Sequence, residues 1–189
     1  MKQYGLLLIA VVVLGACQVK QRQREDQTQS DPALATTELV DIAIVSPEVT
    51  TPDGRLLSAT IRAMARKILI NRKHYAVPKD AFVDRAAAAS NATDAGTIAR
   101  AAGSDAGLFI SLEQWETSDL LPKGRIYAGG TARLVESGGT RVLWERSFKD
   151  WTRVASGDVT TSNRPEVMKN MLREVVQEVL SNLPPKPRR

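Results

Sequence analysis

Two side chains that commonly carry out chemistry in proteins occur once each in this chain, the thiol of Cys17 and the imidazole of His74. A thiolate is a nucleophile that can accept an acyl group, and an imidazole is the usual general base near neutral pH. Nucleophilic catalysis needs such groups in partnership, but His74 stands alone beside Tyr75 at the junction between a predicted helix and a predicted strand. We therefore expect His74 to be a surface or packing residue.

Motifs for metal or cofactor binding are absent from the sequence as well. Zinc sites need cysteine and histidine at set spacings, and one residue of each type makes no such arrangement. Loosely spaced carboxylate pairs such as Asp80 and Asp84 have no partner motif, so we expect them to be solvated. Gly129-Gly130 lies inside a predicted strand, where a bulge or a close backbone contact fits better than a phosphate loop. The sequence therefore predicts no enzyme activity, no metal and no cofactor.

The residues before Cys17 predict a secretory signal. Lys2 supplies a positive charge, an apolar stretch runs from Leu6 to Val13, and small residues follow. The apolar run is only about a dozen residues long, which is short of the roughly 20 that a membrane-spanning helix needs. We expect residues 1–16 to be removed as a signal peptide.

A lipidation motif ends at the cysteine. Leu14, Gly15, Ala16 and Cys17 together resemble the lipobox of bacterial lipoprotein precursors. The resemblance implies that the thiol of Cys17 is diacylated and that the freed amino group then receives a third fatty acid. Each buried methylene contributes about 0.8 kcal/mol, so two or three chains would hold the protein on a membrane essentially permanently. The alternative is a buried or disulfide-forming cysteine, for which the chain offers no second thiol.

The same resemblance implies a location. Gln18 follows the cysteine and is not the aspartate that retains such lipoproteins in the inner membrane, so we expect a lipid-anchored protein on the periplasmic face of the outer membrane. From Gln18 to Thr37 the chain has almost no large apolar residue and cannot bury enough surface to order itself. We therefore expect residues 17–38 to be the lipidated cysteine and a disordered tether.

The remaining composition is that of a single globular domain, which we place at 39–183 before a disordered basic tail at 184–189. Of the 189 residues, 43% are hydrophobic and 25% are charged, which leaves room for one core. The 26 basic and 21 acidic residues give a net charge of +5, which favours acidic partners such as anionic lipid or cell-wall polymer. The basic residues are scattered, with no dense patch bearing interleaved aromatic residues, so we expect no nucleic-acid binding.

Hydrophobic periodicity predicts an alternation of strands and helices. The first expected elements are a buried strand at 39–45 ended by Pro47, a helix with an apolar stripe of Leu57, Ile61, Met64 and Ile68, and a short strand at 75–77. A helix at 94–102 follows, capped by Thr93 and ended by Gly103, and then a strand that begins at Ala106. The last elements are a hairpin with arms at 124–136 and 141–151 and a final helix that begins with a capping box of Asn163 and Glu166. Arg62 and Arg66 lie off the apolar stripe, and we expect both to be solvated.

This order predicts an α/β (α+β) fold with a single mixed sheet, antiparallel strands toward the C-terminus and three helices packed on one side. In the strand from Ala106, alternation places the apolar residues Leu108 and Ile110 on one face. Phe109 and Trp115 then lie on the opposite face.

Three segments of the chain resemble a known family of envelope domains. They are DIAIVSPEV, TIARAAGSDAGLFI and ARLVESGGTRVLWE. In order and kind they resemble the domain shared by CsgG, the N-terminal part of TolB and the penicillin-binding-protein activator LpoB. The chain is most similar to small outer-membrane lipoproteins sometimes linked to ABC-type transport, and the likeness covers residues 39–183. The one candidate insertion, residues 116–125, is too short and polar to form the membrane-crossing hairpins of CsgG, so we expect no pore.

Two functional hypotheses of different class follow. In the first, the domain is an accessory or adaptor module of a cell-envelope complex that binds a periplasmic protein through aromatic anchors and an arginine rim. The residues proposed for this surface are Phe109, Trp115, Tyr127, Arg133 and Trp151. The alternative for the rings is that they pack under the domain's own helices. In the second hypothesis, the protein is a structural lipoprotein whose basic residues and PPKPRR tail bind peptidoglycan or an anionic membrane surface. Either form could be a homo-oligomer.

Overall fold

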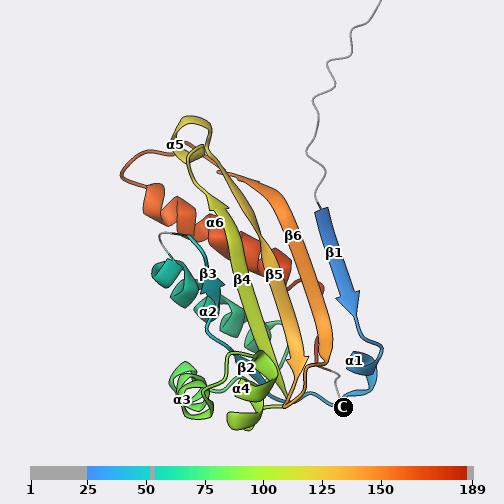
Figure 1. Cartoon of the computed structure of the whole chain (residues 1–189). Coiled ribbons are helices and arrows are strands. Elements are labelled where there is room, and N and C mark those ends of the chain that lie inside the picture. The colour runs from blue at the N-terminus through green and yellow to red at the C-terminus, as the bar shows by residue number, and fades with distance from the viewer. Residues whose placement is uncertain (1–24, 52–53, 187–189) are drawn as a thin grey trace, which may run out of the picture.

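The computed structural model of the chain describes residues 25–51 and 54–186 (Figure 1). The signal peptide at 1–16, the lipobox with Cys17, and the tether up to residue 24 lie outside the described residues. One sheet of six strands forms the centre, in the order β1-β6-β5-β4-β2, and β3 also pairs with β4. The predicted fold class, a mixed sheet with antiparallel C-terminal strands, is therefore confirmed.

The helices and strands alternate along the chain much as the periodicity predicts. Their bounds are β1 (Glu25–Ser30), α1 (Ala33–Thr36), β2 (Ile42–Ile44), β3 (Glu48–Val49), α2 (Gly54–Asn71), α3 (Asp80–Ser90), α4 (Ala95–Ala101), β4 (Ala106–Glu116), α5 (Leu120–Lys123), β5 (Arg125–Glu136), β6 (Val142–Val154) and α6 (Arg164–Val179). The short strand expected at 75–77 makes only one isolated bridge, between Asp41 and Ala76, because the chain turns at Pro78 into α3.

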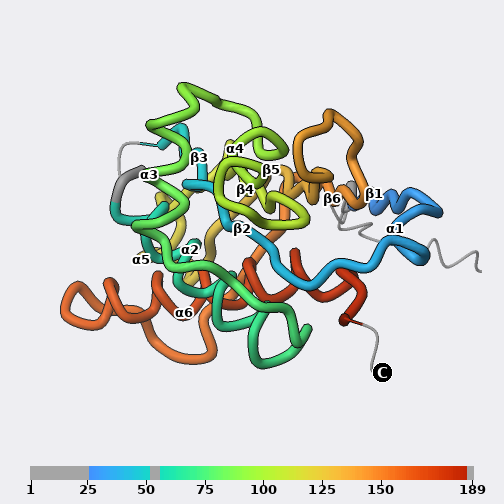
Figure 2. Tube along the Cα trace, turned by 90° about the horizontal axis from the view of Figure 1, so that it is seen from below, coloured from blue at the N-terminus to red at the C-terminus, as the bar shows by residue number. Residues whose placement is uncertain are grey.

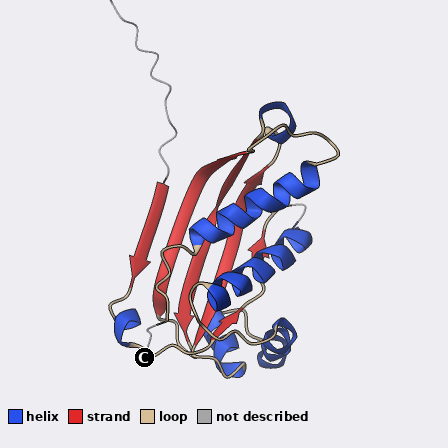
Figure 3. Ribbon diagram, turned by 180° about the vertical axis from the view of Figure 1, so that it is seen from behind, coloured by secondary structure: helices blue, strands red, loops and turns tan. Residues whose placement is uncertain are grey.

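The long helices α2 and α6 lie together across one face of the sheet (Figure 3). The main core lies between these helices and the strands, and the predicted stripe of α2 supplies Leu57, Ile61 and Ile68 to it. From the strands, Trp144 and Trp151 are fully buried in the same core. The sequence thus positions the apolar faces of both helices against one side of the sheet.

A second, smaller core lies on the opposite face, between β2, α3 and α4. Seen from below, α4 and α6 lie on opposite sides of the strands (Figure 2). The expectation that the helices pack on one side only is therefore wrong. The reason is visible in β2, where three consecutive residues are buried and alternation is lost, as in a strand covered on both faces. Gly107 permits the close approach of α4, since a Cβ there would lie 2.2 Å from the carbonyl oxygen of Ala95.

Arg62 fixes α3 beside β2 and is buried instead of solvated. Its guanidinium donates to the Ile44 carbonyl oxygen at 2.8 and 3.1 Å and to Asp84 Oδ1 at 2.6 Å. Arg66 donates to the carbonyl oxygen of Val77 at 3.0 Å. The two arginines of α2 thus bond to β2, to α3 and to the segment before α3. The expectation that both are solvated is therefore wrong.

The helix caps differ from those expected. Asp94, not Thr93, caps α4, because its Oδ1 accepts a hydrogen bond from the Thr97 amide at 2.7 Å. The left-handed Gly103 after this helix is confirmed, with φ of 64°. No capping box forms at α6, where Asn163 Oδ1 instead accepts from the Thr160 amide at 2.8 Å.

Both ends of the domain are more ordered than the sequence suggests. The expected disordered tether is wrong from Glu25 onward, because residues 25–30 form β1, which pairs antiparallel with β6. At the other end, Pro184–Lys186 of the expected disordered tail lies against the domain. The Lys186 amide donates to the Lys73 carbonyl oxygen at 2.8 Å, and Tyr75 Oη donates to the Pro184 carbonyl oxygen at 3.1 Å.

Candidate functional site

The sheet has a polar surface on the face of β4, β5, β6 and β1 that points away from α2 and α6. We call it the open face, because in the described part of the chain no helix lies over it beyond α4 at one end (Figure 1). Pairing places Ser111, Thr131, Ser147 and Gln27 side by side in one row across the four strands. Short hydroxyl and amide side chains therefore form the middle of this face.

Two β-bulges and a pair of glycines make a hollow in the open face. The pairing of β4 with β5 shifts between Leu112 and Gln114, and that of β5 with β6 shifts opposite Gly129. A Cβ at Gly130 would lie 2.1 Å from the Ser111 carbonyl oxygen, so the strand backbones approach closely only because this residue is glycine. The predicted bulge at Gly129-Gly130 is confirmed, and the hollow has a volume of about 480 Å³.

Hydrogen bonds hold the rim of the hollow. The side-chain amide of Gln114 donates to Asp150 Oδ1 at 3.1 Å and to Glu116 Oε1 at 2.7 Å. In return, Gln114 Oε1 accepts from the Asp150 amide at 3.3 Å. Asp150 itself has a φ of 52°, which the bulge in β6 requires. The rim is thus tied to both bulges, and it presents a fixed set of donors and acceptors.

Arg133 and Tyr127 lie on the open face, as expected for a partner surface. Arg133 Nε donates to Glu145 Oε2 at 2.7 Å, and half of the arginine side chain is exposed. Tyr127 is half-buried, and its hydroxyl lies 3.5 Å from Asp119 Oδ2. Both side chains remain accessible beside the hollow.

Trp115 and Trp151 do not lie on the open face, so the expectation that they anchor a partner is wrong. The bulge at Glu113 inserts one residue into β4 and turns Trp115 toward the helix-covered core. The bulge in β6 does the same for Trp151, whose ring centroid lies 4.6 Å from that of Phe148. Both tryptophans pack under the domain's own helices.

Phe109 is also unavailable as an exposed anchor. It points to the expected side of β4, but α4 covers this part of the sheet and the ring packs against the smaller core. Simple alternation could not reveal this, because the position of α4 depends on contacts with β2 that are distant in the sequence.

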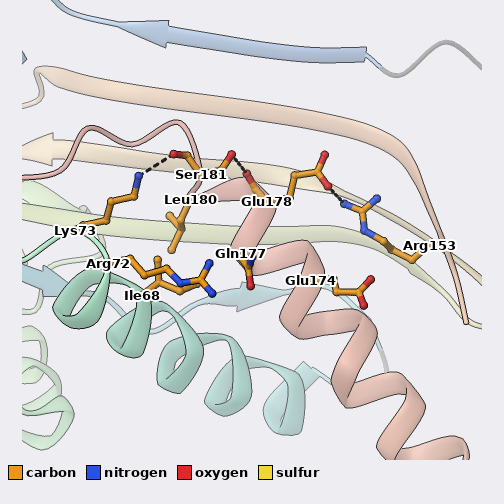
Figure 4. A pocket seen from close by; sticks show the side chains of 9 residues that line it. All are labelled: Ile68, Arg72, Lys73, Arg153, Glu174, Gln177, Glu178, Leu180 and Ser181. Carbon is orange, nitrogen blue, oxygen red and sulfur yellow. Dashed lines mark hydrogen bonds and ion pairs between the residues drawn. The ribbon is translucent and has the colours of Figure 1, made fainter. Parts of the chain in front are cut away.

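A second pocket lies between the last turns of α2 and α6, with a volume of about 550 Å³ (Figure 4). Charged side chains line it; Arg153 pairs with Glu178, and Lys73 Nζ donates to the Ser181 carbonyl oxygen at 2.7 Å. Burial lowers the pKa of the Lys73 ammonium, and the positive charge of Arg72 lowers it further. The bonds of these lining residues connect the end of α2 to the segment after α6, and β6 to α6.

Of the groups considered for chemistry, Cys17 lies outside the described residues. His74 is exposed in the turn after α2, with a φ of 63°. Among the described residues, no three histidine, cysteine, aspartate or glutamate side chains are grouped as a metal site would need. In the same part of the chain, no helix is both long enough and apolar enough to span a bilayer.

Comparison with known proteins shows similarity of fold. The chain is similar to a PelC dodecamer from Paraburkholderia phytofirmans (TM-score 0.52, 18% identity, 88% of this chain and 100% of that chain). It is also similar to lipoprotein GNA1162 from Neisseria meningitidis (TM-score 0.50, 20% identity, 76% and 99%) and to hypothetical protein CT253 from Chlamydia trachomatis (TM-score 0.52, 12% identity, 76% and 95%). No protein-family model matches the chain, and a comparison with curated proteins found no match.

At these identities the likeness concerns the fold alone. The fold is one that a lipoprotein of known structure also has, as the resemblance in sequence implies. The closer relation to CsgG and TolB and the link with ABC-type transport stay predictions.

Proposed function

We propose that this chain is a bacterial lipoprotein, anchored by acyl groups on Cys17 to the periplasmic face of the outer membrane, and that its domain is a non-catalytic adaptor of a cell-envelope complex. The open face is the surface that binds the partner protein. The observation that carries this proposal is the hollow between the two bulges, which is lined by fixed polar groups and flanked by Arg133 and Tyr127.

The composition of the open face supports binding of a protein. Arginine and tyrosine are enriched at protein interfaces, and hydrogen-bonding groups occur there at regular density. The backbone groups around Gly129 and Gly130 are held by sheet pairing on both sides, so little order must be gained when a partner binds. The likeness in fold to a lipoprotein is compatible with an accessory role in the envelope.

The absence of an enzyme activity is part of the proposal. It is supported by the exposed position of His74 and, in the pocket between α2 and α6, by the ion pair of Arg153 with Glu178 and the hydrogen bond from Lys73 to the Ser181 carbonyl oxygen. Acylation would occupy the only thiol of the chain.

The structural-lipoprotein alternative has less support. Arg62, Arg133, Arg141, Arg146 and Arg153 each pair with a carboxylate, so these cations do not form an uncompensated basic surface. A second copy of this chain is a further candidate partner, since one fold neighbour is a dodecamer.

Site-specific photo-crosslinking in intact cells tests the adaptor function. A photo-reactive amino acid at Thr131, inside the hollow, should give one discrete adduct that survives raised salt. Screening acts over about 10 Å at 0.1 M salt and weakens only contacts that depend on exposed charge. The matched control places the same group at Lys67, which is exposed on α2.

The adduct should be lost in an Arg133→Glu variant that is still anchored and folded. Its mass identifies the partner as another envelope protein or as a second copy of the chain. Equal crosslinking from positions 131 and 67, or none from either, contradicts the proposal. Binding to isolated peptidoglycan that disappears with salt would favour the alternative.

A further inference from the structure

One end of the domain brings together α5, the start of β5, the end of β6 and the start of α6. Arg125 of β5 pairs with Val154 of β6, and the Ala155 amide donates to the Gly124 carbonyl oxygen at 2.7 Å. Arg164, the first residue of α6, donates to Thr117 Oγ1 at 3.4 Å. We call this region the α5 end, because α5 forms its tip (Figures 1 and 3).

Large apolar side chains project into solvent at the α5 end. Leu56 and Val154 are the most exposed large apolar residues in the described part of the chain, at 75% and 63%, and Leu121 of α5 is 45% exposed. A groove of about 740 Å³ beside Leu56 runs between the first turns of α2 and α6 and is lined by Pro165 and Met168. Single exposed apolar residues are common on proteins, so the exposure of these side chains does not by itself identify what this surface contacts.

The proposed anchor enters the fold from the side of the α5 end. Glu25 is paired with Lys149, and β1 runs antiparallel to β6, so the first residue of β1 is directed toward the α5 end (Figure 1). About eight residues separate Cys17 from Glu25, which can span at most about 26–29 Å. From Lys149 to Val154 the strand covers roughly 16 Å. The anchor therefore reaches the level of the α5 end with length to spare.

Other orientations fit this anchor less well. From Lys149 back to Val142 is roughly 23 Å, before the hairpin turn is added, and the chain would first have to reverse its direction. That path uses nearly the whole reach of the anchor. The β1 edge is close to the anchor, but β1 has no apolar side chain and begins with Glu25 and Asp26.

We propose that the α5 end rests on the lipid headgroups of the membrane that holds the anchor, with Leu121, Val154 and Leu56 in the interfacial layer. This inference rests on the proposed acylation of Cys17. Apolar side chains at such an interface are buried by about 5–10 Å at the boundary between headgroups and acyl chains. The plane of the open face would then be roughly perpendicular to the membrane plane, and the open face would be accessible from the periplasm.

Spin labels on single introduced cysteines test the orientation. Acylation blocks Cys17, so the acylated protein would carry one reactive thiol in each of the variants Leu121→Cys, Val154→Cys, Thr140→Cys and Gln29→Cys. All four positions are exposed, and Thr140 and Gln29 mark the hairpin turn and the β1 edge. Each purified, labelled protein is bound to vesicles of phosphatidylethanolamine and phosphatidylglycerol, and collision with oxygen and with a water-soluble nickel chelate is compared.

We expect the labels at 121 and 154 to lie about 5–10 Å below the headgroups and to lose most of their collisions with the chelate. The labels at 140 and 29 should stay in water. If the labels at 121 and 154 remain in water on vesicle-bound protein, or if the label at 140 or 29 is the buried one, the inference is overturned while the proposed function stands. If Cys17 also takes a label and the protein does not bind vesicles, acylation has failed, and the proposed function is overturned together with this inference.

Discussion

Arg146 joins three parts of the chain through one buried guanidinium, with only 4% of the residue exposed. It donates to both carboxylate oxygens of Asp26 in β1, at 3.0 and 2.6 Å. It also donates to Ser181 Oγ at 3.0 Å and to the carbonyl oxygens of Glu178 and Val179 at the end of α6. A cation is favourable there because helix carbonyls at a C-terminus lack partners within the helix.

Replacing Arg146 by alanine should destabilise the domain by about 3 kcal/mol, because the change leaves Asp26 and the helix carbonyls without their buried partner. The free energy of unfolding in urea measures this loss. The matched control is Arg133→Ala, whose exposed pair with Glu145 should be worth at most about 1 kcal/mol. Equal losses in the two variants would contradict the assigned role of Arg146.

Asp31 holds the segment after β1 onto the hairpin. Arg141 donates to its two carboxylate oxygens, both at 2.8 Å, and the Ala33 amide donates at 2.8 Å. These hydrogen bonds, that from Arg141 first, lower the pKa of Asp31 below its ordinary value of 3.8. The folded state therefore binds this proton less tightly than the unfolded state, and the carboxylate stabilises the attachment above pH 3.8.

This contribution should disappear as the pH falls through the lowered pKa of Asp31. The Asp31 amide donates to the Leu143 carbonyl oxygen at 2.9 Å, so its hydrogen-exchange protection reports the attachment. We expect the protection factor to fall relative to core amides as the pH drops below about 3.8 and through the lowered pKa. In an Asp31→Asn variant, protection should already be low and should not change over that range. A pH dependence that is the same in both proteins would exclude Asp31 as its cause.

At the level of elements, periodicity predicted what depends on local pattern. The helices α2 and α6 and the hairpin of β5 and β6 carry regular apolar spacing, and β2 lies in a short continuous apolar run. The strand β1 was missed because the sequence EDQTQS has no apolar residue, and its pairing rests on backbone hydrogen bonds and on Asp26. No signal in its side-chain pattern could have identified it as a strand.

The β-bulges explain the errors at the candidate site. Each bulge shifts the alternation by one residue, so Trp115 and Trp151 face the core although simple alternation in β4 places Trp115 outside. Gly129-Gly130 indicated a bulge in this region, but not which strand would gain a residue. Tyr127 and Arg133 were placed correctly because the alternation of β5 keeps them on the open face.

Gly130→Ala tests the close approach that forms the hollow. The new Cβ would lie 2.1 Å from the Ser111 carbonyl oxygen, so β4 and β5 must separate. We expect a loss of about 1–3 kcal/mol in the free energy of unfolding, as for other overpacked sites. Gly157→Ala is the control, since nothing lies within 4 Å of its added Cβ, and it should change stability by less than about 0.5 kcal/mol. Similar values for the two variants would show that the strands tolerate a side chain at Gly130.

At the scale of the whole molecule, the proposed anchor, the sheet and the open face form one arrangement. The proposed acylated N-terminus would lead into β1, which Arg146 bonds to β6 and to α6. With the α5 end on the membrane, the hollow would be held at a fixed height within reach of a periplasmic partner. The sequence predicted the anchor and the class of fold, whereas the position of the hollow depends on bulges and on long-range packing.

The central claim is that Cys17 becomes the acylated first residue of the mature protein. Mass spectrometry of the N-terminal peptide from protein isolated from its own envelope tests this claim most directly. We predict a peptide that begins at Cys17, lacks residues 1–16, and carries fatty acids on both the sulfur and the amino group. A peptide with an unmodified thiol, or with residues 1–16 still attached, would contradict it.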